Sequence, residues 1–481
     1  MKNILIAIRS IFKKGRHNVM KIVSLGIGLA VGLVLIAKVY FEQSYDDFYP
    51  DRDRVYQVWA KYQQNGGELK DYPQTSGGIA PTMQQQIPEI ETVTRYTSFG
   101  DWTFTMTDTK MKYSGRCIIA DSCFFDILPR PMLIGNAKEV LSTPMYVLIS
   151  SRIAKNIGGD VIGKNFTVDS SPGRTMTIGG VFEEVPENSH SRYDVIVSMA
   201  SAGRFMWEGS PTNMLGNDRY ISYVKLHKGV NPLALEEQVH TFVNSYFPPE
   251  EQQKTGFNIG FSFHKLDNLH KELPQVKRMT WILSLLAFAL IFTAVMNYIL
   301  IVISSIVNRS KEVAVHKCYG ASENNIHGMM FGEALVHIVL SLILALLLIL
   351  AFRGTVEELL ATSLDSLLLS NGSLVLLGIC ILVFFVSGFM PGSLYARIPV
   401  ASAFRNYREN KRIWKKALLL VQFVATGFLV TMLVFVARQY TFMVNDRPGY
   451  AYENLAYCGL AGVDSTSRAK ILDEVMRLPG V

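Results

Sequence analysis

The sequence predicts an α-helical transmembrane bundle with an α+β domain inserted into it on the extracytoplasmic side. Only 18% of the 481 residues are charged and 49% are hydrophobic, whereas a soluble protein carries about 25% charged residues. The missing charge is concentrated in five long apolar runs, and residues 42–277 instead have the composition of a soluble domain large enough to bury its own core. Basic residues also flank the apolar runs on alternate connections, as membrane topology requires.

Five apolar runs are long enough to cross a membrane. A helix rises 1.5 Å per residue, so a hydrocarbon core of about 30 Å needs roughly 20 apolar residues. The second run, from Met279 to Val307, contains no charged residue. The predicted spans are residues 19–41, 279–307, 334–352, a stretch within 373–391, and 417–437.

The basic residues predict the orientation of these spans. The first 21 residues carry six of them, the connection after the second span carries three, and residues 397–416 carry seven. The connection between spans three and four has a single arginine set against three acidic residues. Because cytoplasmic connections are enriched in Lys and Arg, we predict a cytoplasmic N-terminus, with residues 42–277 and the segment after residue 438 outside.

The flanks of the first span indicate an uncleaved anchor. Residues 1–18 are predicted to form an amphipathic helix on the inner membrane surface, because five apolar residues between Ile4 and Phe12 share one helical face. No small-x-small cleavage site precedes the polar residues that follow the span. Residues 278–405 are predicted to be a membrane unit with spans two to four, and residues 406–416 a basic cytoplasmic linker.

Residues 42–277 alternate strand and helix signals. Period-2 alternation of apolar and polar residues predicts strands, and caps predict helices, among them Asn231 followed by Pro232 at the first helical position. The acidic pair Asp46-Asp47 is expected to be solvated surface. Strands are predicted at 55–62, 92–98, 102–106, 145–150, 175–182 and 219–226, and helices at 81–86, 151–157 and 231–246.

No catalytic, cofactor-binding or metal-ligating residue is predicted, so we do not expect an enzyme. The run Gly158–Asn165 nearly matches a phosphate-binding loop, but it has Asn165 where a Ser or Thr is required and lies between a helix and a strand in the wrong order. The net charge is +7, but the Lys and Arg residues lie beside the predicted spans, which argues against a nucleic-acid partner. Cys117 and Cys123 could form a disulfide in an oxidising compartment, or remain two free thiols.

Several segments resemble the FtsX/MacB-type permeases of bacterial ATP-binding-cassette (ABC) systems. In the outside domain these are Phe124-Phe-Asp-Ile-Leu, Leu133-Ile-Gly-Asn, Val147 to Ala154, Ile162-Gly-Lys, and Ile178 to His190. In the membrane half they are Asn297, the run Arg309-Ser-Lys-Glu-Val-Ala-Val-His-Lys-Cys-Tyr-Gly-Ala321, Glu333, Gly392 to Pro399, and Val421-Gln-Phe423. Together they cover most of the chain.

The resemblance implies a periplasmic core domain of the MacB type and an FtsX-like membrane unit in the bacterial inner membrane. It also implies that residues 308–332 couple to a separate cytoplasmic ATPase, which binds the ATP. A second interpretation is that the charges of this segment only set topology beside lipid headgroups. The residues expected in the coupling segment are Arg309, Lys311, Glu312, Lys317, Gly320, Ala321 and Glu333.

Spans one and five look like repeats, because each follows a basic leader and ends in an aromatic-rich segment. Since family members with two such halves exist, we expect residues 438–481 to begin a second extracytoplasmic domain of a longer, eight-span protein. The expected partners are the ATPase, a second permease half or a second copy, membrane lipid and a periplasmic adaptor.

Two functions are compatible with this organisation. One is a permease or mechanotransmission subunit that uses ATP hydrolysis by its partner to move the outside domain, for efflux or for handling lipoproteins or peptides. The alternative is a membrane-anchored regulator or sensor that controls a cell-wall enzyme or an antibiotic response without transport.

Overall fold

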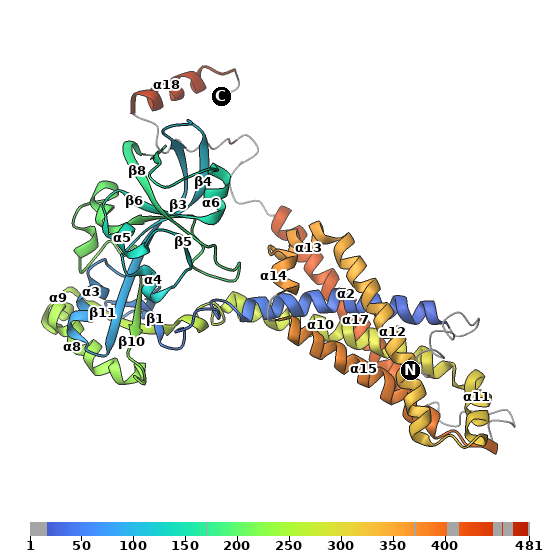
Figure 1. Ribbon diagram of the computed structural model, residues 1–481. Coiled ribbons are helices and arrows are strands. Elements are labelled where there is room, and N and C mark those ends of the chain that lie inside the picture. The colour runs from blue at the N-terminus through green and yellow to red at the C-terminus, as the bar shows by residue number, and fades with distance from the viewer. Residues whose placement is uncertain are drawn as a thin grey trace. The chain divides into compact units, whose positions relative to one another are not determined.

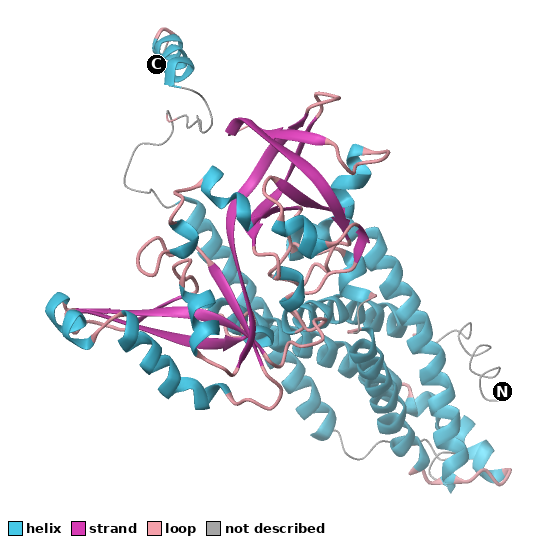
Figure 2. Ribbon diagram, turned by 60° about the vertical axis from the view of Figure 1, so that its left-hand side comes forward, coloured by secondary structure: helices cyan, strands magenta, loops and turns pink. Residues whose placement is uncertain are grey.

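A computed structural model describes residues 17–169, 171–369, 372–401, 413–445, 455 and 465–479 (Figure 1). The chain divides into two compact units, one formed by residues 1–43 with 273–452 and the other by residues 44–272 with 453–481. Among the described residues, helices make up the first unit and every strand lies in the second (Figure 2). Following the location predicted from the sequence, we call these the membrane unit and the periplasmic unit, and describe each by itself.

The membrane unit contains five helices that are long and apolar enough to span a membrane, counted over the described residues. The second helix ends sooner than its apolar run, at Ser304, and a new helix, α11 (Ile306–Cys318), begins two residues later. The break was not visible in the sequence because the run stays apolar through Val307. The five helices are α2 (Asn18–Gln43), α10 (Pro274–Ser304), α12 (Glu323–Ala351), α15 (Ser373–Ala396) and α17 (Ile413–Asn445).

Helix α2 packs against α10 and α12 around a shared apolar core. Two of its three glycines, Gly28 and Gly32, face α10 so closely that a Cβ atom on them would collide with Ala294 and Ile291. Small residues allow helices in a membrane to approach in this way, where van der Waals contact rather than water exclusion drives association. Two short helices, α13 (Arg353–Leu360) and α14 (Leu364–Leu368), connect α12 to α15.

The periplasmic unit is built on an eleven-stranded mixed sheet, counted over the described residues, in the order β11-β1-β10-β3-β4-β9-β6-β8-β5. Strand β2 pairs with β1, and β7 pairs with β3 and β8. The strands are β1 (Val55–Gln64), β2 (Lys70–Tyr72), β3 (Ile90–Met106), β4 (Lys112–Ala120), β5 (Met132–Ile134), β6 (Tyr146–Ser150), β7 (Asn165–Val168), β8 (Ser171–Phe182), β9 (Val195–Ser198), β10 (Ile221–Leu226) and β11 (Phe257–Lys265).

In the part of the unit that the structure describes, the core around this sheet consists of three apolar clusters, and several of the helices contribute residues to them. Asn231 caps the 3-10 turn η3 (Pro232–Leu235) as expected, and the α-helix proper begins four residues after the proline, at Glu236. The α-helices are α3 (Ile79–Gln86), α4 (Phe124–Ile127), α5 (Ala137–Ser142), α6 (Ser151–Ile157), α7 (Ala202–Phe205), α8 (Glu236–Tyr246), α9 (Pro249–Thr255) and α18 (Ser465–Met476).

Strand β3 is one long strand where two shorter ones were expected. It changes register against β4 between Ser98 and Gly100, and Gly100 has a φ of +75°. A glycine adopts this left-handed conformation without a steric penalty, so the strand bends here without ending. The bend lets one strand contribute to three of the apolar clusters.

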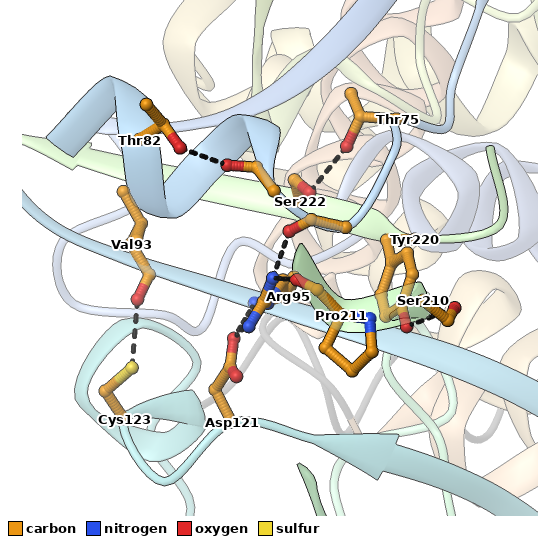
Figure 3. A network of polar contacts seen from close by, with 12 residues as sticks. Thr75, Thr82, Val93, Arg95, Asp121, Cys123, Ser210, Pro211, Tyr220 and Ser222 are labelled. Atoms are coloured by element: carbon orange, nitrogen blue, oxygen red, sulfur yellow. Dashed lines mark hydrogen bonds and ion pairs between the residues drawn. The ribbon is translucent and has the colours of Figure 1, made fainter. Parts of the chain in front are cut away.

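A buried polar network ties the strands to the loops that cover them (Figure 3). The backbone N–H and Nε of Arg95 donate to Asp121 Oδ2 at 2.9 and 3.2 Å, and Nη1 donates to the carbonyls of Gly77 and Pro211. Burial raises the pKa of Asp121, and the Arg95 charge opposes that shift. Further pairs in the network are Thr75 with Ser222 and Ser210 with Tyr220, each at 2.8 Å.

Three predicted segments extend beyond the described residues. Only residues 17 and 18 of the predicted surface helix are described, and residues 406–412 of the predicted linker lie outside the description. Residues 413–416 were assigned to that linker, but they form the first turn of α17. Of the segment after residue 445, the structure describes residue 455 and residues 465–479, which include α18.

Candidate functional site

A buried ion pair joins α11 to α12. Arg309 of α11 and Glu333 of α12 are 5% and 6% exposed, and Arg309 Nη1 lies 2.6 Å from Glu333 Oε2. Arg309 Nε also lies 3.6 Å from Glu312 on the same helix. The sequence predicted all three residues as part of one functional segment, and the structure brings them together. Because two of them are buried, they connect helices inside the bundle and do not form its surface.

The same arginine contacts a third helix through Tyr395 of α15. The guanidinium lies 5.5 Å from the ring centroid, a cation–π distance. The Tyr395 hydroxyl donates to the carbonyl of Val302 at 3.1 Å and lies 3.1 Å from Ser305 Oγ, at the break between α10 and α11. Four helices therefore meet at one buried cluster of Ser305, Arg309, Glu333 and Tyr395, which we call the inner joint.

Lys317, near the end of α11, binds the end of α15. Its Nζ donates to the carbonyls of Ala396 and Ile398 at 2.6 and 2.8 Å. The last carbonyls of a helix have no partner within the helix and attract positive charge. Lys317 thus fixes α11 to α15 at a second point. The sequence analysis did not predict this role, because it placed Lys317 in a charged cytoplasmic connection.

The chain reverses direction between α11 and α12 in a tight turn. Gly320 has a φ of +84°, the left-handed conformation that favours glycine after a helix. The N–H of Ala321 donates to the His316 carbonyl at 3.0 Å, and Ser322 then caps α12 by accepting from the Asn325 N–H. The predicted Gly320 and Ala321 therefore shape the turn and supply no charge.

The surface of this turn carries an aromatic side chain that the sequence analysis did not single out. Tyr319 is 88% exposed, and Lys311 and His316 on the same segment are also exposed. An exposed tyrosine at a helix end is the kind of residue that dominates protein–protein interfaces. The sequence could have pointed to Tyr319, because it is an aromatic residue directly before a glycine in a basic connection between two spans.

Polar side chains within the spans tie helices to one another. Gln422 of α17 donates to Asn297 of α10 at 2.5 Å, and the Tyr298 hydroxyl lies 3.1 Å from His337 Nδ1 of α12. Ser341 donates to a backbone carbonyl of α2 at 3.1 Å. Such bonds are favourable inside a membrane because water does not compete for them.

In the periplasmic unit, the chain that follows α2 is fixed by a buried carboxylate. Asp46 is fully buried, contrary to the expectation that it is solvated. Its oxygens lie 2.7 Å from Ser189 Oγ and 2.6 Å from His190 Nδ1, and its N–H donates to the Asn188 carbonyl at 2.9 Å. Asn188 Nδ2 in turn donates to the Ser44 carbonyl at 2.6 Å.

The segment that precedes α10 joins the same cluster. Tyr45 stacks on His270 with ring centroids 3.6 Å apart and planes within 8°, and His190 lies 5.3 Å from His270. Lys271 lies 3.4 Å from Asp47. Residues 44–47, 188–190 and 270–271 thus form what we call the outer joint, which holds together the chain leaving one span and the chain entering the next.

Comparison with known proteins identifies both units. The MacB-like periplasmic core domain matches residues 20–242, and the FtsX-like permease C-terminal family matches residues 284–400. A domain of a protein from Porphyromonas gingivalis assigned as a permease is 33% identical, with 45% of this chain and 91% of that chain covered and a TM-score of 0.42. The chain is a permease of the FtsX/MacB type.

Two other solved structures match part of the permease at lower sequence identity. The periplasmic region of MacB from Actinobacillus actinomycetemcomitans is 16% identical, covers 43% of this chain and 87% of its own, and has a TM-score of 0.30. The extracellular domain of the ABC-type transporter YknZ from Gram-positive bacteria is 11% identical, with coverages of 43% and 98% and a TM-score of 0.30. No curated protein matches the sequence.

Family membership establishes the general organisation. The permease is a membrane protein with a periplasmic domain and an FtsX-like helical unit, and it belongs to the permease components of ABC transporters. Permeases of this kind work with an ATPase and in a dimeric arrangement. The α+β content of the periplasmic unit and the transmembrane bundle predicted from the sequence are both confirmed.

Cys117 and Cys123, for which the sequence left open a disulfide or two free thiols, are free in the structure. Cys117 is fully buried in an apolar cluster, and this burial raises its thiol pKa well above the ordinary value. Cys123 donates to the Val93 carbonyl at 2.9 Å, and burial raises its pKa to about 11. Each thiol therefore has its own environment in the structure.

The glycine-rich run Gly158–Asn165 uses its backbone groups within the fold. The Gly163 N–H donates to the Ile178 carbonyl at 2.8 Å, the Lys164 N–H points to the Val161 carbonyl at 3.3 Å, and Asn165 begins β7. A phosphate-binding loop needs such N–H groups directed at its ligand. Among the described residues, no group of three or more His, Cys, Asp and Glu is arranged to hold a metal ion.

Proposed function

We propose that the permease converts ATP hydrolysis by a separate cytoplasmic ATPase into movement of its periplasmic domain. The observation that carries this proposal is the inner joint. It links α11, whose surface is polar and exposed, to α12, α15 and the end of α10 through one buried ion pair and one tyrosine. A displacement of α11 would therefore act on several spans together.

The energetics of the joint support this role. Removing one partner of a buried ion pair costs about 3–5 kcal/mol, because the remaining charge is left in a low-dielectric environment. The bundle therefore resists a separation of Arg309 from Glu333 and moves as a linked set instead. Lys317 adds a second attachment between α11 and α15.

The basic connections support a cytoplasmic position for α11. Arg309, Lys311 and Lys317 occupy one of the connections that the positive-inside rule assigns to the cytoplasm. In this orientation the ATPase meets the surface around Tyr319, while the α13–α14 connection lies on the other side of the membrane. The ATPase binds the ATP and the permease supplies no catalytic residue.

The outer joint supports transmission at the other end of the spans. Helices α2 and α10 pack tightly at Gly28 and Gly32, and the chain continues from each into residues of that joint. Because the intramembrane polar contacts tie α2, α10, α12 and α17 together, they favour a mechanical linkage over a polar route for a solute. This movement would serve efflux or the handling of lipoproteins or peptides, and it would serve a regulator equally well.

A substitution at Tyr319 tests the ATPase contact. Tyr319→Ala removes an 88%-exposed ring and should leave the fold intact. The matched control is Leu359→Ala, at a residue 78% exposed in α13. We expect the ATPase activity that co-purifies with the permease from native membranes to fall roughly 30-fold in the first variant, as for loss of a 2 kcal/mol interface residue, and to stay unchanged in the second. Equal activity in both variants would contradict the proposal.

Accessibility labelling tests the orientation separately. In a background with all five cysteines replaced by serine, single cysteines are placed at Tyr319 and at Trp207, which is 65% exposed in the periplasmic unit. We expect a membrane-impermeant maleimide applied to whole spheroplasts to label Trp207→Cys, and to reach Tyr319→Cys only after the membrane is opened. The reverse result would place the coupling segment outside and rule out its contact with a cytoplasmic ATPase.

A further inference from the structure

Strand β11 leaves one edge of the periplasmic sheet open. In the described part of the chain β11 pairs only with β1. The Gly256 carbonyl accepts from Asn65 on the β1 side at 2.6 Å, whereas the Ile259 N–H points the other way and donates to Gln252 Oε1 at 3.2 Å. Because backbone groups alternate sides along an antiparallel strand, the groups of Phe261 and Phe263 point outward as well.

The Gln252 side chain shows what this edge accepts. It comes from α9 and places an amide beside the strand, with its oxygen accepting from Ile259 and its Nε2 donating to the Phe247 carbonyl at 2.6 Å. A side-chain amide is chemically a peptide group. The outward backbone N–H of Ile259 is therefore already bonded to a peptide-like group. The backbone N–H and C=O groups of Phe261 and Phe263 follow at the same two-residue spacing and can bind peptide groups in the same way.

A groove runs along these next positions, and residues of β11, η3 and α8 line it. Its volume is about 430 Å³. Apolar side chains line both of its walls, and Leu233 on the helical side is 73% exposed to solvent. The apolar lining residues are Leu233, Val239, Val243, Ile259, Phe261 and Phe263.

This edge lacks the features that normally protect a strand from pairing. Proteins protect open edges with prolines, charged residues, bulges or very short strands. The stretch from Ile259 to Phe263 is Ile-Gly-Phe-Ser-Phe, without charge or proline, in a strand of nine residues. The charged residues that line the groove lie on other elements, and they are Lys61 and Glu236, of opposite sign.

We propose that this groove, which we call the β11 groove, binds an extended segment of another polypeptide in the compartment that the periplasmic domain faces. The segment adds a strand antiparallel or parallel to β11, with its peptide groups bonded to Phe261 and Phe263 and alternate apolar side chains between the sheet and α8. This is the geometry by which sheet edges beside a helix capture peptides. The mixed charges of the lining match a segment without strong net charge.

The groove fits a single chain better than a second copy of the permease. A second copy would present its own β11 already flanked by η3 and α8, so two helical segments would have to share the space beside one edge. A lone extended segment brings no such neighbour. The bound chain is therefore part of a separate protein or peptide.

Peptide binding to the full-length permease in detergent tests the proposal. The probe is a fluorescent peptide of alternating Val and Thr, and its matched control carries N-methyl groups on every second residue, which block strand pairing but keep the side chains. Fluorescence anisotropy measures both. We expect micromolar binding of the first peptide and at least tenfold weaker binding of the second. Equal binding of the two would overturn strand addition.

Two variants locate the binding. Leu233→Lys places a charge in the β11 groove at an exposed position, and Leu215→Lys does the same at a residue 49% exposed that lines a different pocket. We expect at least fivefold weaker peptide binding for Leu233→Lys and no change for Leu215→Lys. Unchanged binding by Leu233→Lys would place the site elsewhere and refute the proposal. If the permease self-associates through this edge, with Leu233→Lys abolishing the association, the occupant is a second copy and the proposal is also refuted.

Discussion

Replacing both partners of the inner joint should separate its structural role from its mechanical one. In the single variant Arg309→Met, Glu333 loses the Arg309 guanidinium in a site where its side chain is 9% exposed. Two opposite charges about 4 Å apart attract by about 4 kcal/mol at an effective dielectric constant of 20. Loss of one partner of such a buried pair costs about 3–5 kcal/mol of folding free energy.

The double variant Arg309→Met with Glu333→Leu leaves no charge behind. Buried ion pairs replaced by apolar residues of similar volume are often as stable as the original or more so. We therefore expect the single variant to lower the Tm of the purified permease by roughly 10 °C, and the double variant to recover most of that loss. An apolar pair makes neither the ion pair with Glu333 nor the cation–π contact with Tyr395 that orient Arg309. The double variant should therefore still couple ATP hydrolysis poorly to movement of the spans.

Thermal unfolding and coupled activity together decide the outcome. Unfolding is followed in detergent for the wild type and both variants, and the stimulation of the ATPase by the permease is measured for each. We expect wild-type stability but at least tenfold weaker stimulation for the double variant. A double variant that is stable and stimulates like the wild type would refute the idea that this ion pair carries the mechanical signal.

Three further predictions concern the outer joint, the periplasmic domain and the helix packing. Asp46→Asn should lower the free energy of unfolding by about 1–3 kcal/mol because the charge-assisted bonds to Ser189 and His190 weaken, whereas the same change at the partly exposed Asp47 should lower it by less than about 1 kcal/mol. Thermal unfolding compares the two variants, and equal losses of stability would contradict the buried joint. The pKa of Asp51 is lowered to about 2, mainly by its hydrogen bond to Arg54, so the ionised carboxylate stabilises the folded state above about pH 4 and this stabilisation is lost as the pH falls towards 2. Since Asp51 is partly exposed to solvent, Asp51→Asn should reduce the loss of stability between pH 5 and pH 2 by only about 1 kcal/mol, as measured by unfolding over that range. Gly28→Leu should separate α2 from α10 and lower the Tm by several degrees, and an unchanged Tm would show that the close approach is dispensable.

The spans were predictable because their signal is local. A run of about 20 apolar residues has few alternatives to a membrane helix, and the structure has a helix at each predicted position. The break at Ser305 was missed since hydropathy does not change there. It depends on Tyr395, ninety residues later in the chain, which bonds to the carbonyl of Val302.

The strands were recovered unevenly for a similar reason. Strand β11 alternates Phe257, Ile259, Phe261 and Phe263 and could have been recognised from that period of two. Strand β9 is four residues long and buried on both faces, so it lacks a periodic signal. Strand pairing of this kind is set by the neighbouring strands of the sheet.

Arg309 and Glu333 of the inner joint were found through a family resemblance, but Ser305 and Tyr395, which complete it, were not. Nothing in the sequence pairs Lys317 with the end of α15, about eighty residues later. Asp46 was expected at the surface because adjacent acidic residues usually are solvated, and its burial depends on a loop 144 positions away. Long-range partners of this kind appear only once the fold has brought the segments together.

The glycine notches of α2 also limit how the bundle can deform. With the side chains of Ala294 and Ile291 seated at Gly28 and Gly32, a piston-like slide of α2 along α10 would have to lift both side chains out of their notches at once. A tilt of the two helices as one rigid rod leaves those side chains in place. If an ATPase drives the bundle as proposed, its stroke would move α2 and α10 as a swing of the paired helices, and a bulkier residue at either notch would weaken this preference for a swing over a slide.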